Sequence, residues 1–372
     1  MDVNAPLALL GGLKPAAFMK RHWQKKPLLV RQAWPGVAAP VARARLFELA
    51  GRDDVESRLV QRRHGGWQLR QGPLPRRALP PVSRPGWTVL VQGLDLHLDE
   101  ARAMVEPFRF VPEARLDDRM VSWASDGGGV GPHVDAYDVF LLQVHGRRRW
   151  RVGPVADARF IEGLPLRILQ RFEPEHDWVL EPGDLLYLPP MWGHDGIAVG
   201  ECMTCSVGFR SPRRDGLADE LLQRLADSEG EGPLYRDPSQ PATVTPGLIP
   251  PALARFARTA LQRRLRDADA VERALGEVLS EPKPRVWFQA GASARLTTGV
   301  RLDRRTRMLY DARQVFINGE SFRAGGRDGR LMRRLADTRR LSGRDCAALG
   351  EGARAVVQGW LDDGWLQAED ET

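Results

Sequence analysis

Cysteine is scarce in this sequence, which has three cysteines among its 372 residues: Cys202, Cys205 and Cys346. Three unevenly spaced thiols are too few for the disulfide framework of a small secreted protein. Cys202 and Cys205 have the spacing of a redox pair, but they lie in VGECMTCSVGF, a segment typical of a β-strand. Residues three apart on a strand face opposite sides, so the spacing disfavours a redox function.

Long apolar runs are missing as well. No segment approaches the roughly 18 to 20 apolar residues that a membrane-spanning helix needs. The first residues, MDVNAPLALLGGLKPAAF, lack the basic segment of a secretory signal. Hydrophobic residues make up 42% of the chain and charged residues 28%, as in ordinary globular proteins. We therefore predict a cytoplasmic protein, and 372 residues indicate two or three domains.

Lysine is the third scarcity. The chain has five lysines among 55 basic residues, and its net charge is +7. A positive charge suits an acidic partner such as RNA or a ribonucleoprotein. An arginine excess of this kind also follows from genome composition, so the sequence leaves direct nucleic-acid binding open.

The distribution of apolar segments predicts three parts. Between residues 86 and 210, short strand-like segments alternate with turn residues, which is typical of a β-sandwich or barrel. We assign a mainly β first domain to residues 1–211. Residues 212–281 are predicted to be helical, and residues 282–372 form the third part.

The second and third parts differ in their patterns. Between Ala252 and Leu279, apolar residues recur at three- and four-residue steps, as on amphipathic helices. This stripe must be covered, either by the β-domain or by a second copy of the chain. Residues 282–372 combine a hairpin with an Asn318-Gly319 turn and two helical segments. Strands beside short helices favour a winged-helix-like domain.

Histidine is also rare, and among the seven histidines His133 and His194 lie in patterns typical of a metal site. His133 follows a glycine-rich turn in SDGGGVGPHVDAYDVF, and Asp135 comes two residues later. If this segment is a strand, both side chains point to one face. Two histidines and one carboxylate leave coordination positions open, as in non-haem Fe(II) oxygenases, although zinc hydrolases also use such ligands. The His-x-Asp spacing on a barrel strand favours iron.

The third ligand comes from EPGDLLYLPPMWGHDG. Gly183, Pro189 and His194 follow the spacing of the second cupin motif, with Met191 in place of its second glycine. Gly127, six residues before His133, matches the first cupin motif. The two motifs together predict that these distant segments meet around one metal ion.

One arginine stands out in HGRRRWRVG. On a strand, Arg148 shares a face with Trp150 and Val152, whereas the neighbouring arginines point the other way. A barrel turns its apolar face inward, so Arg148 is predicted to be buried. A buried guanidinium needs an anionic partner, either a bound carboxylate or an acid of the protein itself. The far carboxylate of 2-oxoglutarate fits this role, with Ser125 as a further hydroxyl contact.

Several of these segments resemble a known family. HWQKKPLLVR, GGGVGPHVDAYDVFLLQVHGRRRWRVG and EPGDLLYLPPMWGHDG, followed by SVGFR, look like the bacterial ribosomal oxygenases of the JmjC family. The resemblance implies a double-stranded β-helix, the cupin or JmjC jelly roll, followed by a helical dimerisation region and a C-terminal winged-helix domain. It also implies a 2-oxoglutarate-dependent dioxygenase that hydroxylates an arginine of a large-subunit ribosomal protein.

The same resemblance implies roles for individual residues. The implied Fe(II) ligands are His133, Asp135 and His194, and the implied 2-oxoglutarate contacts are Arg148 and Ser125. Asp118 and Tyr137 are implied contacts of the substrate guanidinium, because arginine pairs with carboxylates and stacks on aromatic rings. Met191 and Trp192 depart from the family pattern, which leaves the shape of the site open.

Other functions remain possible on the same scaffold. An iron enzyme of this kind could hydroxylate histidine or demethylate N-methyl groups. A different class of function is a metal-binding cupin that regulates transcription through its winged helix, where RLMRRLADTRR is basic.

Overall fold

The structure of the protein is a computed structural model that describes residues 2–63, 66–226, 233–242, 245–290, 296 and 298–369, without the side chain of Asp118. The chain forms two compact units, Met1–Ser211 and Pro212–Thr372. The predicted division of the second unit at residue 281 remains a prediction.

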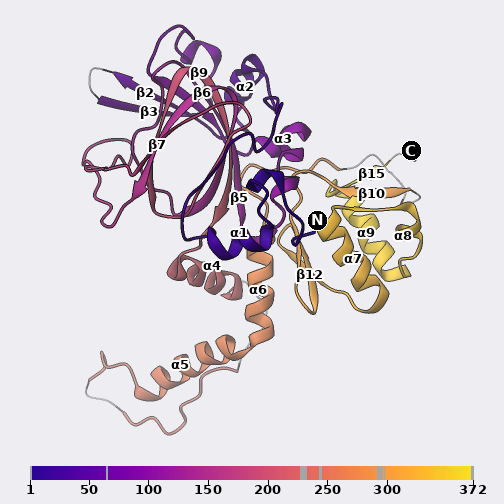
Figure 1. Cartoon of the computed structure of the whole chain (residues 1–372). Coiled ribbons are helices and arrows are strands. Elements are labelled where there is room, and N and C mark those ends of the chain that lie inside the picture. Colours follow the sequence, from indigo (N-terminus) through magenta and orange to yellow (C-terminus); the bar gives the residue numbers. More distant parts are fainter. Residues whose placement is uncertain are drawn as a thin grey trace. The chain divides into compact units, whose positions relative to one another are not determined.

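The described part of the first unit contains a nine-stranded sheet in the order β1-β8-β6-β9-β5-β4-β2-β3, with β7 paired to β6 (Figure 1). The strands are β1 (Leu28–Val30), β2 (Ser57–Arg63), β3 (Gly66–Gln71), β4 (Trp87–Val91), β5 (Leu116–Ala124), β6 (Tyr137–Pro154), β7 (His176–Leu180), β8 (Leu185–Leu188) and β9 (Trp192–Arg210). The helices are η1 (Ala8–Leu10), α1 (Pro15–Arg21), α2 (Arg43–Ala50), η2 (Arg76–Ala78), η3 (Leu94–Leu96), α3 (Asp99–Ala103), η4 (Glu106–Phe108) and η5 (Glu113–Arg115). The antiparallel pairing confirms the predicted mainly β fold.

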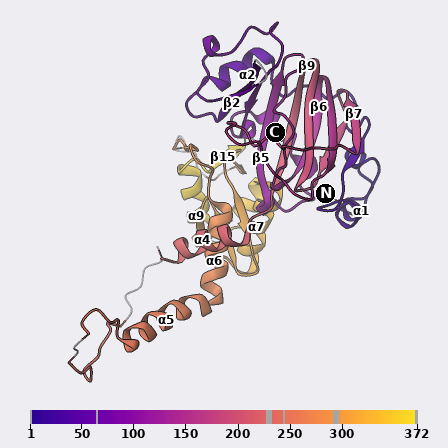
Figure 2. The same ribbon diagram turned by 90° about the vertical axis from the view of Figure 1, so that its left-hand side faces the viewer.

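The two longest strands, β6 and β9, pair along nearly their whole length and lie side by side in Figure 2. Their ladder shifts at Gln143/His145 and again at His145/Arg147. Gly146 lies in this irregular stretch with a φ of 60°, and a Cβ there would be 2.0 Å from the carbonyl oxygen of Glu201. A glycine is therefore required where the strand bends.

The bend decides which side chains of β6 share a face. Before it, the odd-numbered Val139 and Leu141 belong to the same apolar cluster as the even-numbered Trp150 and Val152 after it. Phe140 and its even-numbered neighbours pack into a second, larger cluster with α1 and α2. Because strand side chains alternate, only a bulge between the two stretches allows this change of parity. The bulge therefore directs the second half of β6 toward the site described below.

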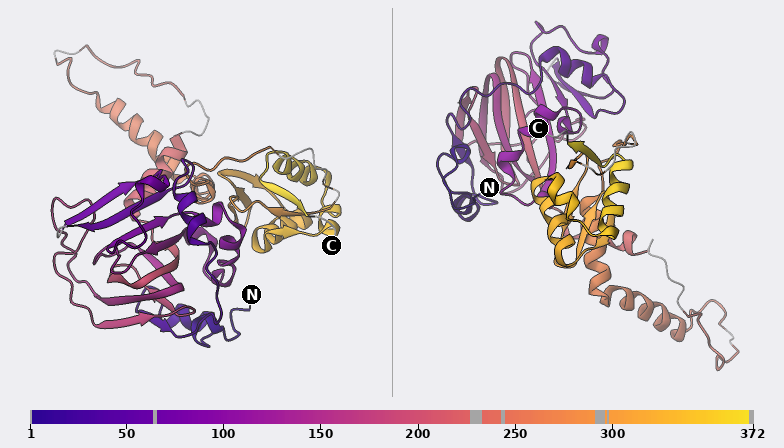
Figure 3. Two further views of the ribbon diagram at one scale, coloured as in Figure 1. Left: turned by 90° about the horizontal axis from the view of Figure 1, so that it is seen from above. Right: turned by 90° about the vertical axis from the view of Figure 1, so that its right-hand side faces the viewer.

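The described elements of the second unit are mostly helical in their first half. They are α4 (Arg214–Ala226), α5 (Pro251–Arg266), α6 (Ala268–Ser280), β10 (Gly299–Leu302), β11 (Met308–Tyr310), β12 (Gln314–Ile317), β13 (Glu320–Arg323), α7 (Gly326–Thr338), β14 (Arg340–Leu341), α8 (Gly343–Ala347), α9 (Glu351–Asp362) and β15 (Leu366–Glu369). The strands form two small sheets, β14-β10-β15 and β11-β12-β13, and the C-terminal helices pack beside the first sheet (Figure 3).

The local sequence explains the breaks between these elements. The predicted amphipathic stretch is divided into α5 and α6 at Asp267, whose side chain accepts a hydrogen bond from the Ala270 N–H at 3.1 Å and so caps α6. The predicted hairpin is present: Asn318 and Gly319 both have positive φ and connect β12 to β13. α6 then packs on the second sheet, where Gly276 leaves room for the Phe316 ring.

Two further expectations concern the cysteines and membranes. Cys202 and Cys205 are buried in separate apolar clusters, as expected for opposite faces of β9. Burial raises the pKa of Cys205 to about 12, which makes this thiol inert. Among the described helices, none combines the length and apolarity needed to cross a membrane.

Candidate active site

His133 and His194 are brought together by the backbone. Each N–H donates to the other residue's carbonyl oxygen at 3.0 Å, and the two ring centroids are 4.2 Å apart. The glycine turn before His133 lies on β9, where a Cβ on Gly129 would be 2.6 Å from the carbonyl oxygen of Gly196. The turn can approach β9 this closely because it carries no side chain at that point.

Asp135 completes the cluster. Its Oδ2 lies 3.7 Å from His133 Nε2 and 3.4 Å from His194 Nε2. One ligand atom from each of the three residues lies within 4.8 Å of the others, which suits a single metal ion. The prediction that a strand directs His133 and Asp135 to one face was partly wrong. β6 begins at Tyr137, and the His133–Asp135 segment is no regular strand. The bridge to His194 and a hydrogen bond from Met191 N–H to the Asp135 carbonyl, at 2.7 Å, hold it instead.

The imidazoles are oriented for metal binding. Nδ1 of His133 lies 2.9 Å from the Gly131 carbonyl oxygen, and Nδ1 of His194 lies 2.9 Å from that of Trp192. A carbonyl oxygen can only accept, so each Nδ1 carries the proton and donates. The lone pair of each neutral ring is then on Nε2, which faces the carboxylate.

The charges in the cluster favour a bound cation. Burial alone would raise the pKa of Asp135, but His133 and the hydrogen bonds from His194 and Tyr137 lower it, so the carboxylate is ionised. Burial and the neighbouring His194 lower the pKa of His133, which favours its neutral form. Burial would also lower the pKa of His194, but the hydrogen bond to Asp135 raises it. Metal binding would displace any proton from its Nε2.

Arg148 is buried on the same inner face of β6, with 5% of its surface exposed, whereas Arg147 and Arg149 are exposed. The predicted alternation is therefore confirmed. Its Nη1 donates to Ser122 Oγ at 3.0 Å, but Nε and Nη2 are buried and have no hydrogen-bond partner in the described part of the chain. No acid of the described residues pairs with it, so among these residues the alternative of an internal salt bridge is not realised. A carboxylate ligand would satisfy the two remaining donors.

The two serines near Arg148 differ in their hydrogen bonds. Ser125 Oγ accepts from Trp87 N–H at 3.1 Å and lies 3.3 Å from the Trp87 carbonyl oxygen, so it is engaged with the main chain. Ser122, which the sequence reasoning missed, is the hydroxyl that contacts Arg148. Its signal was the alternation along β5, where Val121 and Trp123 point into the larger apolar cluster and leave Ser122 on the opposite face.

The two predicted substrate contacts lie at the same end of the sheet. Tyr137, the first residue of β6, hydrogen-bonds the Asp135 carboxylate and pairs across the ladder with Arg210. Asp118 lies in β5 and pairs with Gly208 of the same strand β9. The side chain of Asp118 is outside the described structure.

Comparison with known proteins places this geometry in context. Residues 103–217 match the model of the JmjC domain, and residues 262–367 match that of the ROXA-like winged helix. The chain is 36% identical over 271 residues to the ribosomal protein uL16 3-hydroxylase of Escherichia coli, an alignment covering 72% of this chain and 71% of that protein. It is 36% identical over 230 residues to a Haemophilus influenzae protein named "Probable ribosomal oxygenase", covering 61% and 55% of the two chains.

Solved structures of an E. coli protein, YcfD, are also similar to this chain over nearly its whole length. The X-ray structure of E. coli YcfD matches with a TM-score of 0.85 and 29% identity over 96% of this chain and 98% of that chain. A structure of YcfD described as a ribosomal oxygenase in complex with cobalt and 2-oxoglutarate matches with a TM-score of 0.76 and 30% identity, covering 96% and 99%.

Proposed function

Because this chain belongs to the ribosomal oxygenases of the JmjC family, we propose that it hydroxylates an arginine side chain of ribosomal protein uL16. It is a 2-oxoglutarate-dependent oxygenase with a jelly-roll domain and a C-terminal winged helix, and its cofactor is Fe(II). The observation that carries the proposal is the cluster of two oriented imidazoles and a carboxylate, with His194 buried and His133 and Asp135 partly buried, on the inner side of the sheet that also buries Arg148.

Each residue of the cluster has a proposed task. His133, Asp135 and His194 would hold the iron, and Arg148 with Ser122 would hold the far carboxylate of 2-oxoglutarate. Once bound, the iron would supply the oxidation in which dioxygen gives one oxygen atom to a carbon of the substrate, as a hydroxyl, and the other to 2-oxoglutarate, which leaves as succinate and carbon dioxide. The chain's own residues orient these groups, and the apolar cluster around Trp150 excludes water.

Recognition of the substrate is proposed for Tyr137 and Asp118. An arginine side chain can pair with a carboxylate and lie on an aromatic ring, and both residue types stand at one end of the sheet. The hydrogen bond of Tyr137 to Asp135 links this recognition residue to the metal cluster. Ser125 remains a prediction as a co-substrate contact, and the contact to Arg148 favours Ser122 in its place.

The test is a reconstitution with Fe(II), 2-oxoglutarate and oxygen, using total ribosomal protein as substrate. We expect a gain of one oxygen on an arginine of uL16, located by fragment mass spectrometry. Oxygen on a histidine, or loss of a methyl group, would replace the proposed reaction by one of its two alternatives. His133→Ala should abolish the product, whereas His145→Ala, which removes a half-exposed imidazole of β6 outside the metal cluster, should not.

The regulator hypothesis receives little support from the winged helix. In a helix-turn-helix the second of two consecutive helices contacts base edges in the major groove, and α9 is the helix that directly follows α8. The exposed charged residues of α9 are Glu351, Arg354 and Asp362, and Arg354 donates to the carbonyl oxygens of Ala347 and Leu349. A face with more acids than bases is poorly suited to a phosphate backbone.

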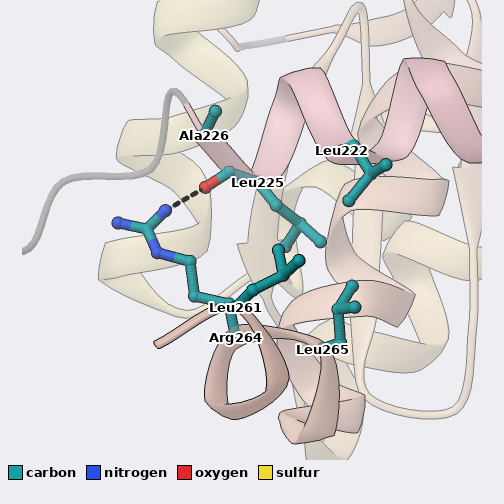
Figure 4. Close-up of a pocket in the computed structure, with 6 residues that line it drawn as sticks. All are labelled: Leu222, Leu225, Ala226, Leu261, Arg264 and Leu265. Carbon is teal, nitrogen blue, oxygen red and sulfur yellow. Dashed lines mark hydrogen bonds between the residues drawn. The ribbon is translucent and has the colours of Figure 1, made fainter. Parts of the chain in front are cut away.

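We also propose that the chain forms a dimer through α4 and α5. None of the residues of α5 is buried, and its apolar residues Leu253, Phe256, Leu261 and Leu265 are each 37% to 55% exposed. A pocket of about 290 Å³ lies between α5 and α4, lined by Leu222, Leu225, Ala226, Leu261, Arg264 and Leu265 (Figure 4). An apolar stripe of this kind on an otherwise charged helix is typical of an interface between chains.

Light scattering tests the dimer directly. The double variant Leu261→Glu, Leu265→Glu should halve the mass of the wild-type particle. Leu248→Glu changes a leucine that is 68% exposed outside the pocket and should leave the mass unchanged. A wild-type protein of monomer mass at micromolar concentration would rule the proposal out.

A further inference from the structure

Trp150 has an unsatisfied hydrogen-bond donor in the same buried region as Arg148. Its side chain is 5% exposed, and its Nε1 is buried and has no partner among the residues that the structure describes. A buried N–H without an acceptor is unfavourable, and most such groups in folded proteins are paired. The described residues therefore supply no hydrogen-bond acceptor for the indole N–H of Trp150.

The position of the indole ring limits what that acceptor can be. The ring centroid is 5.8 Å from Arg148 Cζ and 5.9 Å from the ring centroid of His194. Trp150 thus lies beside both the proposed anchor of the far carboxylate and a proposed metal ligand. A ligand that reaches from the metal cluster to Arg148 would therefore lie near the indole ring.

The ring is also fixed in place. Gly196 lies opposite Trp150 on β9, and a Cβ at Gly196 would be 2.6 Å from Cζ3 of the indole. The benzene edge of the indole therefore rests against the backbone of β9. The Nε1 edge lies on the other side of the ring system, so the donor cannot turn toward this part of β9 without moving the whole side chain.

The number of donors matches one carboxylate. Three buried donor nitrogens of these two side chains have no partner among the residues that the structure describes: Nε and Nη2 of Arg148 and Nε1 of Trp150. An ionised carboxylate is an acceptor only, and its two oxygens offer about four lone-pair sites. One carboxylate can satisfy all three donors, whereas a water molecule offers two lone pairs and would leave one donor unsatisfied.

We infer that Trp150 Nε1–H donates a hydrogen bond to the far carboxylate of 2-oxoglutarate, beside Arg148. The inference rests on the proposed co-substrate site and adds a specificity residue to it. With this bond, the site recognises the far carboxylate through two side chains of different charge. It therefore discriminates 2-oxoglutarate from a 2-oxo acid of the same length that ends in a methyl group.

The experiment measures binding without turnover. Isothermal titration calorimetry of the full chain loaded with Mn(II) gives the Kd of 2-oxoglutarate and of 2-oxopentanoate, which has a methyl group in place of the far carboxylate. Trp150→Phe keeps an aromatic ring and removes the N–H. We expect this variant to bind 2-oxoglutarate about tenfold more weakly, as for the loss of a hydrogen bond to a charged group. Its affinity for 2-oxopentanoate should stay near that of the wild type.

Two control variants separate the possible failures. Trp123→Phe removes another buried, unpartnered indole N–H, which lies in the larger apolar cluster, and should leave both affinities unchanged. Arg148→Gln should weaken 2-oxoglutarate binding strongly. If Arg148→Gln binds as the wild type does, the proposed co-substrate site itself is wrong. If it binds weakly while Trp150→Phe is unaffected, or loses both ligands equally, the hydrogen bond from Trp150 is refuted and the site stands.

A measurement on the wild-type chain covers the case in which Trp150→Phe does not fold. In protein labelled with ¹⁵N-tryptophan and loaded with Zn(II), an indole N–H signal should move downfield with 2-oxoglutarate and become protected from solvent exchange. 2-Oxopentanoate should not produce this change. If no indole signal responds to 2-oxoglutarate, the inference is overturned.

Discussion

Replacing Arg148 by methionine should make the ligand-free protein more stable and remove its response to 2-oxoglutarate. In the wild type Arg148 is 5% exposed, and within the described part of the chain its guanidinium donates one hydrogen bond, to Ser122. Two of its donor nitrogens are unpartnered among the described residues, so without a bound carboxylate Arg148 is a buried charge that is only partly satisfied. Methionine has a similar length and no charge to desolvate.

The size of both effects follows from these contacts. Removing a buried, unsatisfied polar group should raise the free energy of unfolding by about 1–2 kcal/mol. For a unit of this size, Tm should rise by roughly 2–8 °C. At a 2-oxoglutarate concentration of about 100 Kd, the wild type should gain about 2.7 kcal/mol. Loss of a buried charged partner should weaken binding about 100-fold, which leaves the variant a gain of about 0.4 kcal/mol at the same concentration.

The assay is thermal unfolding with and without 2-oxoglutarate, in Mn(II)-loaded protein. Arg149→Met is the matched control on the same strand, because Arg149 is exposed and forms a surface ion pair with Asp177 at 2.7 Å. Surface pairs contribute little, so this variant should keep the wild-type Tm and ligand response. A large loss of stability in ligand-free Arg148→Met would show that Arg148 serves the fold, and an intact ligand response would place the co-substrate anchor elsewhere.

Three other substitutions test the surroundings of the site. Asp135→Ala should lose tightly bound metal, measured by elemental analysis after dialysis, while His145→Ala retains it; equal metal contents would contradict the proposed ligand set. Met191 has a φ of 64°, so Met191→Val should lower the free energy of unfolding by about 1–2 kcal/mol while Met191→Gly does not; equal stability of the two variants would contradict this account. Burial raises the pKa of Asp138 despite its hydrogen bonds to Tyr187 and Gln24. The folded state therefore holds this proton more tightly than the unfolded state, and the stability of the wild type relative to Asp138→Asn should fall as pH rises above about 4. A difference in unfolding free energy that is constant with pH would contradict that direction.

The metal cluster could be predicted from the sequence, but the reason for its geometry could not. His133, Asp135 and His194 follow from motif spacing, and their ligand atoms do lie within 4.8 Å of one another. The prediction relied on a strand that contains His133 and Asp135, whereas the structure holds them by a bridge to His194 and the Met191 amide. A long-range contact of this kind depends on the pairing of β9, which no local pattern in the sequence reveals.

The co-substrate contacts show where strand alternation succeeds and where it fails. The alternation of side chains within RRRWRV correctly predicted that Arg148 is buried, because that segment lies after the bulge and is regular. It could not distinguish Ser122 from Ser125, since the choice depends on where β5 ends, and β5 ends at Ala124. Ser125 leaves the ladder and turns its hydroxyl to the main chain of Trp87.

The arginines of strand β6 show that the side of the strand on which a residue lies determines its partners. Arg149 and Arg151 point outward and form ion pairs with Asp177 and Asp195. Arg148, between them in sequence, points inward and has a serine as its hydrogen-bonding partner among the described side chains. If the inward arginine served only the fold, an acid would be the stable choice beside it, since an uncompensated buried charge costs several kcal/mol. Among the described residues, two buried donor nitrogens of Arg148 and one of Trp150 have no partner, and the proposed dicarboxylate would remove this cost. Part of the stability gained on binding 2-oxoglutarate would therefore come from relief of this desolvation cost.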